Sequence, residues 1–137
     1  MDEMEKNLKQ EELHIAVQNQ DRGLVKKLLD EGFHPNQFDE ISHTPLHYAC
    51  ELEDYYLIKL LLDYGADINA QNLETDAGNT PLGNIAKEAS AELIEYLLQK
   101  GADPTKRGWM KLNAIDRAKQ RTDKEKKEIL ELLNDAI

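Results

Sequence analysis

Residues 44–50 read Thr-Pro-Leu-His-Tyr-Ala-Cys, and residues 57–70 read Leu-Ile-Lys-Leu-Leu-Leu-Asp-Tyr-Gly-Ala-Asp-Ile-Asn-Ala. Thr44 followed by proline predicts a helix start, because threonine caps the first turn and proline tolerates the missing N–H there. The leucines and isoleucine of 57–62 form a stripe spaced for one buried helical face. Gly65 follows that run, where a left-handed residue ends a helix at little cost. This stretch therefore predicts two short helices joined by a turn.

The same pattern returns along the chain. Thr-Pro-Leu recurs at 80–82, and the glycine stands 21 residues after the threonine in both copies. Degenerate copies flank these two at an offset of 33 residues, because 13–16 matches 46–49 and 114–118 matches 81–85. Repetition at a fixed period of this length is typical of stacked repeat proteins.

The Thr-Pro-Leu-His-x-Ala signature with this period resembles the ankyrin-repeat family over about residues 11–137. The resemblance implies an all-α fold, an ankyrin-repeat solenoid of stacked helix-turn-helix units with β-hairpin-like fingers. A single helix pair cannot bury its own stripe, so stacking supplies the core. We expect a polar N-terminal extension at 1–10 and a single ankyrin-repeat domain at 11–137. The predicted repeats are approximately 11–43, 44–79, 80–112 and 113–137.

Charge narrows the classes of partner. The 137 residues include 27 Asp or Glu and 17 Lys or Arg, which gives a formal net charge of −10. Acids outnumber bases up to Thr105, and the balance reverses from Lys106 onward. Such a chain is repelled by nucleic acid and by anionic membranes. The charge favours a basic protein partner, although it also serves simple solubility.

The remaining composition points to the cytoplasm. Cys50 is the single cysteine, so the chain forms no internal disulfide. No apolar run approaches the roughly 18 residues that span a bilayer, and residues 1–10 lack the apolar stretch of a secretory signal. We expect a cytoplasmic protein that is monomeric when free.

No pattern in the sequence predicts catalysis, a cofactor or a metal. His14 and His47 hold equivalent repeat positions, and the resemblance implies that this histidine makes structural hydrogen bonds between neighbouring repeats. His43 and His47 lack a third ligand at the spacing that zinc requires. Cys50 falls on a predicted buried face, as a core residue would. We predict that the protein is not an enzyme.

Two departures from the repeat carry functional interest. The link from Gly65 to the next threonine is three residues longer than the link from Gly32, and the extra length lies in 72–78. This longer finger either contacts a partner or is a tolerated insertion. The last finger, residues 106–111, holds the only tryptophan, Trp109, between cations. Trp109 is either a binding hot spot or part of the terminal cap.

Ankyrin repeats bind on their fingers and on the first helix of each pair, and the family's variable positions transfer to this chain one by one. In the first repeat, this transfer places Ile15, Gln18 and Asn19 of the first helix among the predicted binding residues. The principal predicted partner-binding residues are Phe38, Asp39, Glu40, Ile41, Tyr48, Glu51, Leu52, Leu73, Glu74, Asp76, Asn84, Lys87, Arg107, Trp109 and Met110. Apolar anchors interleaved with acids suit a basic partner that also presents apolar groups.

Three functions remain open on the sequence. The first is a protein-binding module, and a small acidic inhibitor of one basic partner fits the charge of the chain. An immunity protein that neutralises a toxin such as a basic nuclease is one form of this inhibitor, favoured by the absence of a second domain for an adaptor to connect. A generic adaptor with several partners is the alternative, and an enzyme is the class that the sequence disfavours.

Overall fold

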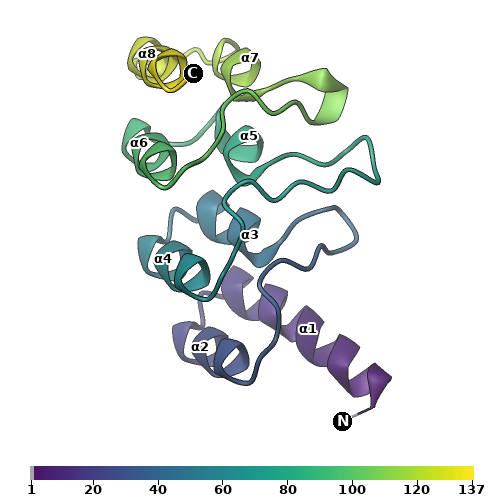
Figure 1. The fold of residues 1–137 in the computed structure, drawn as a ribbon. Coiled ribbons are helices and arrows are strands. Elements are labelled where there is room, and N and C mark those ends of the chain that lie inside the picture. The colour runs from purple at the N-terminus through teal and green to yellow at the C-terminus, as the bar shows by residue number, and fades with distance from the viewer. Residues whose placement is uncertain (1) are drawn as a thin grey trace. The chain divides into compact units, whose positions relative to one another are not determined.

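The structure is a computed structural model that describes residues 2–137 (Figure 1). Within these residues it contains eight α-helices, one short 3₁₀-helix and no strand. The α-helices come in pairs, one pair to each predicted repeat, which confirms the all-α repeat fold. The chain divides into two compact units, the first ending at Asp67 and the second covering Ile68–Ile137.

The first unit contains α1 (Glu3–Gln18), α2 (Arg22–Asp30), α3 (Pro45–Glu51) and α4 (Tyr55–Asp63). Its core consists of the apolar stripes that the sequence predicts. Among its fully buried side chains are Leu13, Val17, Val25, Leu46, Cys50, Leu57, Ile58 and Leu61. Burial raises the pKa of the Cys50 thiol well above its ordinary value, so the thiol stays protonated and serves as a small apolar core residue.

The longest helix of this unit is α1, with 16 residues against seven in α3. It begins after Asp2, whose carboxylate accepts a hydrogen bond from the Glu5 N–H at 2.8 Å and so caps the first turn. Residues 3–10 form the N-terminal half of α1, so the predicted boundary at residue 10 lies inside this helix. In Figure 1 this half runs on past the part of α1 that lies beside α3.

Two histidines make structural hydrogen bonds in the first unit. His47 Nδ1 accepts from the Thr44 N–H at 3.0 Å and lies 2.8 Å from the Thr44 hydroxyl, which fixes the start of α3. His14 Nε2 lies 3.0 Å from the Gln37 carbonyl oxygen and therefore ties α1 to the first finger, residues 36–43. Both histidines make structural hydrogen bonds, but these contacts lie within one predicted repeat rather than between neighbouring repeats.

A buried carboxylate joins the two helix pairs of this unit. Asp54 caps α4 by accepting the Leu57 N–H at 3.1 Å. The same side chain accepts from Gln20 and from Arg22, each at 3.1 Å. Burial alone would raise the pKa of Asp54, but these hydrogen bonds and the Arg22 charge hold it below its ordinary value. Asp54 is therefore an ionised link between the α1–α2 turn and α4.

The second unit contains α5 (Pro81–Ile85), α6 (Ala91–Gln99), the 3₁₀-helix η1 (Trp109–Lys111), α7 (Ala114–Ala118) and α8 (Lys126–Asp135). Thr80 caps α5 by accepting the Gly83 N–H at 3.0 Å, as its sequence predicts. Gly101 follows α6 with a φ of +98°, the left-handed conformation expected after a helix end. Among the fully buried side chains of this unit are Leu82, Leu93, Ile94, Leu97, Ile129 and Leu133.

Candidate protein-binding surface

The first unit contains an open groove between α1 and the first finger. Its volume is about 830 Å³. Four of the predicted binding residues on the finger line it, namely Phe38, Asp39, Glu40 and Ile41, together with Tyr48 from α3 and Ile15 from α1. Ile15 is 52% exposed and Ile41 is 61% exposed, so apolar surface faces solvent here. The fold thus brings together residues that lie more than 30 positions apart in the sequence.

Hydrogen bonds to the Asp39 side chain hold the first finger in its conformation. Its Oδ1 accepts the backbone N–H groups of Ile41 at 3.1 Å and His43 at 2.9 Å, and its Oδ2 accepts the Tyr48 hydroxyl. Burial would raise the pKa of Asp39, yet these hydrogen bonds keep it below its ordinary value. Burial and the bond to Asp39 raise the pKa of Tyr48. Asp39 is therefore negatively charged at neutral pH, while Tyr48 is largely buried and contributes by holding the finger.

Two predicted residues of the first unit lie outside this groove. Glu51 and Leu52 come at the C-terminal end of α3, where Leu52 is 39% exposed. The Glu51 carboxylate lies 3.7 Å from His43 Nδ1. These two side chains are accessible, but the structure does not place them among the groove-lining residues.

The groove is acidic, and so is its whole unit. Glu11, Asp39 and Glu40 line it, and no lining residue is Lys or Arg. The first unit holds six Lys or Arg against 15 Asp or Glu, a formal net charge of −9. The second unit, with 11 against 12, has a net charge of −1. Nearly all of the net negative charge of the sequence therefore belongs to the unit with the larger groove.

In the second unit the long finger packs on the last finger. Gln71 Nε2 donates to the Gly78 carbonyl oxygen at 3.0 Å and to the Arg107 carbonyl oxygen at 2.5 Å. A Cβ on Gly108 would lie 2.8 Å from the Gly78 carbonyl oxygen and 3.0 Å from Asn79 Cα. The two loops therefore approach so closely that glycine is required at the contact.

This contact brings four more predicted residues together. Leu73 and Asp76 of the long finger and Arg107 and Met110 of the last finger line a second groove of about 390 Å³. Leu73 is 85% exposed and Met110 is 66% exposed. Met110 also has a positive φ of +58°, an uncommon conformation for a side chain of this size and one that can mark a functional site.

Hydrogen bonds of its backbone anchor Trp109. Its N–H donates to Asn79 Oδ1 at 2.9 Å, and its carbonyl oxygen accepts from Arg117 at 2.9 Å. The side chain is 52% exposed, which leaves half of the indole accessible to a partner. Of the other predicted residues, Glu74 and Lys87 are exposed and Asn84 is half-buried, and none of them lines the second groove.

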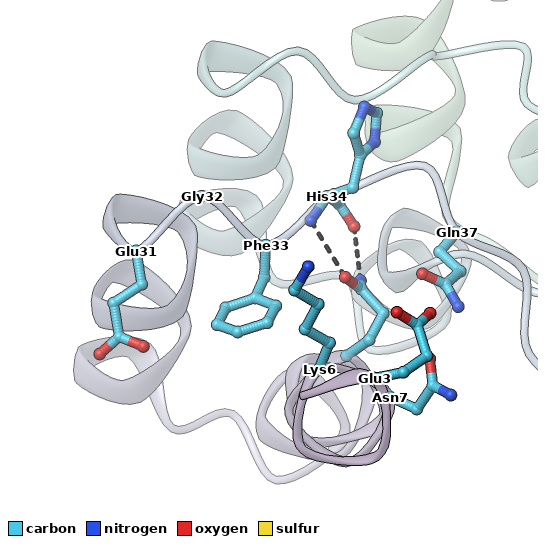
Figure 2. A pocket seen from close by; sticks show the side chains of 9 residues that line it. Glu3, Lys6, Asn7, Glu31, Gly32, Phe33, His34 and Gln37 are labelled. Atoms are coloured by element: carbon cyan, nitrogen blue, oxygen red, sulfur yellow. Dashed lines mark hydrogen bonds between the residues drawn. The ribbon is translucent and has the colours of Figure 1, made fainter. Parts of the chain in front are cut away.

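A further hollow of about 710 Å³ adjoins the groove of the first unit along α1, among Glu3, Lys6, Phe33 and their neighbours (Figure 2). The dashed lines in Figure 2 mark the bonds of the Gln10 amide to the His34 N–H and carbonyl oxygen, at 3.2 and 2.7 Å. The bonds between Gln10 and His34 were not predicted from the sequence, because residues 1–10 have no counterpart in the repeat. Glu, Lys and Gln are good helix formers, so their presence in residues 1–10 could have indicated a helix there.

Neither a metal site nor a membrane-spanning helix is found in the part of the chain that the structure describes. Residues 2–137 hold no group of three or more side chains placed to bind a metal ion. Within the same range, no helix is long and apolar enough to cross a membrane.

The structure consists of paired short helices, and the fingers between the pairs expose apolar and acidic side chains. This arrangement defines a protein-binding repeat module. The family model for ankyrin repeats matches residues 6–108 with three copies, and the chain belongs to this family. Ankyrin repeats generally mediate protein–protein interaction and are typically not enzymes. The pair α7–α8 follows the matched region as a further helix pair. No curated protein matches the chain.

Proposed function

We propose that this protein binds a basic partner protein and that the groove of the first unit carries most of the electrostatic attraction. The observation that supports this most strongly is the charge of the first unit, −9, around a groove that has three acidic lining residues and no basic one. Complementary charge of this size accelerates encounter, and exposed apolar side chains then slow dissociation. Ile15, Ile41 and Phe38 are the apolar anchors in the groove.

The second unit contributes apolar and mixed contacts. Leu73, Trp109 and Met110 expose large apolar side chains, and Arg107 and Asp76 both line the second groove. Arginine and tryptophan are the residue types most enriched at binding hot spots. These residues give specificity to a partner that charge alone would bind loosely.

The finer form of this proposal is a cytoplasmic inhibitor that holds one partner tightly, such as an immunity protein for a basic toxin. An adaptor with several partners is the alternative. The first experiment is a pull-down from the native source at low and then high salt, with the bound proteins identified by mass. A single basic partner that survives high salt and is toxic when expressed alone supports the inhibitor. Several salt-sensitive partners, none of them toxic, favour the adaptor.

Charge reversal then tests the surface with the identified partner. We expect Glu40→Lys with Glu11→Lys to weaken binding about tenfold or more at low salt, because two attractive charges become repulsive. Glu74→Lys with Asp76→Lys should also weaken binding, but less, since the second unit is nearly neutral. Circular dichroism checks that each variant folds. Unchanged affinity of the first variant would remove the groove from the interface, and unchanged affinity of the second would remove the long finger.

A further inference from the structure

The N-terminal half of α1 exposes an apolar row that the repeat does not explain. Met4, Leu8 and Ile15 are 67%, 60% and 52% exposed. With Glu11 they are spaced by four, three and four residues, which places all four on one helical face. The buried residues of α1, among them Leu13 and Val17, lie on the opposite face. We call the row Met4, Leu8, Glu11 and Ile15 the α1 stripe.

The surroundings of the α1 stripe are acidic. Glu5 and Glu12 flank it on the helix, and Glu11 lies within it. The two lysines of α1 lie on the other side: Lys9 Nζ is 3.3 Å from the Glu31 carboxylate and 5.8 Å from the centre of the Phe33 ring. Figure 2 shows Lys6 directed toward the same phenylalanine. Neither lysine of α1 therefore lies on the exposed face that carries the α1 stripe.

The geometry points to a basic amphipathic helix of a partner protein, docked along the α1 stripe and against the adjoining groove. Glu11 and Ile15 belong to both surfaces, so the stripe continues into the groove. Every backbone group along the middle of α1 is bonded within the helix, so an extended peptide would find no backbone partners there. A helix satisfies its own backbone and packs side chains between the ridges of α1.

Charge selects this occupant over a second copy of the chain. Two α1 stripes packed together would bring Glu5, Glu11 and Glu12 of both copies into one interface, within units of net charge −9. Lysine or arginine beside a row of leucines would instead meet these carboxylates. The inference rests on the proposed binding of a basic partner, and it adds the segment of the partner and its place on this chain.

The test uses a fluorescent peptide of about 18 residues with leucine at helical spacing and lysine elsewhere, long enough to form a helix on binding. A second peptide carries glutamate in place of lysine. We expect the lysine peptide to bind and the glutamate peptide not to bind. Backbone NMR shifts should fall on residues 4–18 and on the first finger. Met4→Ala with Leu8→Ala should weaken binding about tenfold. The matched control is Ile137→Ala, which truncates a terminal side chain that is 74% exposed.

Four results would overturn the inference. They are failure of the lysine peptide to bind, equal binding of the glutamate peptide, shifts confined to other residues, and equal affinity of the Met4 and Leu8 variant. Sedimentation at increasing concentration tests the other occupant, because a dimer that this variant dissociates would assign the stripe to a second copy. If the variant binds the identified natural partner normally while the Glu11 and Glu40 variant loses it, the stripe proposal fails and the proposed function stands.

Discussion

Replacing Asp54 by alanine should destabilise the protein by about 2–3 kcal/mol. The lost α4 cap accounts for about 1 kcal/mol. The hydrogen bond from Gln20 adds about 1 kcal/mol. The Arg22 side chain is 54% exposed, so its pairing with the fully buried carboxylate adds less than about 1 kcal/mol after screening. For a chain of this length the loss corresponds to a melting temperature lower by about 6–12 °C.

The assay is thermal unfolding followed by circular dichroism, with Asp21→Ala as the matched control. Asp21 caps α2 by accepting the Leu24 N–H at 3.2 Å, and no comparable link to a second helix pair is seen for it. Its replacement should cost only about 1 kcal/mol. If Asp54→Ala lowers the free energy of unfolding no more than Asp21→Ala does, the link between the helix pairs contributes nothing to stability and the reasoning is wrong.

The effect of Asp54 should also depend on pH in a definite direction. Its folded pKa lies below the ordinary value, so its ionised form stabilises the folded state fully above about pH 4. This stabilisation is lost as the pH falls through the folded pKa. The gap in melting temperature between the natural protein and Asp54→Ala should therefore be smaller at pH 3 than at pH 6. A gap that widens in acid would contradict the assigned hydrogen bonds.

Three further substitutions test the loops by thermal melts. Gly65→Val should lower the melting temperature, because a β-branched residue fits the φ of +94° poorly, and an unchanged value would contradict the assigned turn. Lys111→Gly should stabilise by about 1 kcal/mol by relieving a φ of +60°, whereas Lys106→Gly, where φ is not positive, should not. Gly108→Ala should cost about 1–3 kcal/mol, since its Cβ would meet the Gly78 backbone, and a neutral result would mean that the two fingers separate freely.

The repeated helix pairs could be predicted because their signals are local. Thr44 and Thr80 start helices in the structure where the sequence places them, and Gly65 and Gly101 follow helices with positive φ. Each of these signals depends on a few neighbouring residues and is reinforced by its copy in the next repeat. Periodicity therefore identified the helix pairs without any knowledge of tertiary contacts.

The helical start of α1 could have been predicted but was not. Asp2 and Glu5 have the spacing of a capping pair, and the residues after them are good helix formers. The composition of residues 1–10 suggested only a polar extension, because no repeat copy exists for comparison. The exposed row of Met4 and Leu8 follows from that helix.

The surface residues were harder to place, because their environment depends on contacts between distant segments. Phe38 and Ile41, named from the family positions, line the groove of the first unit, but the burial of Tyr48 follows from its bond to Asp39. The contact of Gly78 with Gly108 joins two fingers 30 residues apart, and no local pattern encodes it. The sequence therefore predicts where these loops lie along the chain, but not how they pack on one another.

The positions of Cys50 and Trp109 give each unit its own natural reporter. The only thiol is buried in the first unit, and the only indole is half exposed in the second. Thiol-reactive reagents reach Cys50 only when the first unit opens, so the labelling rate measures that opening. Indole fluorescence records the last finger. Comparing the two signals through a denaturant titration shows, without any introduced label, whether the two units unfold as one cooperative body or in succession.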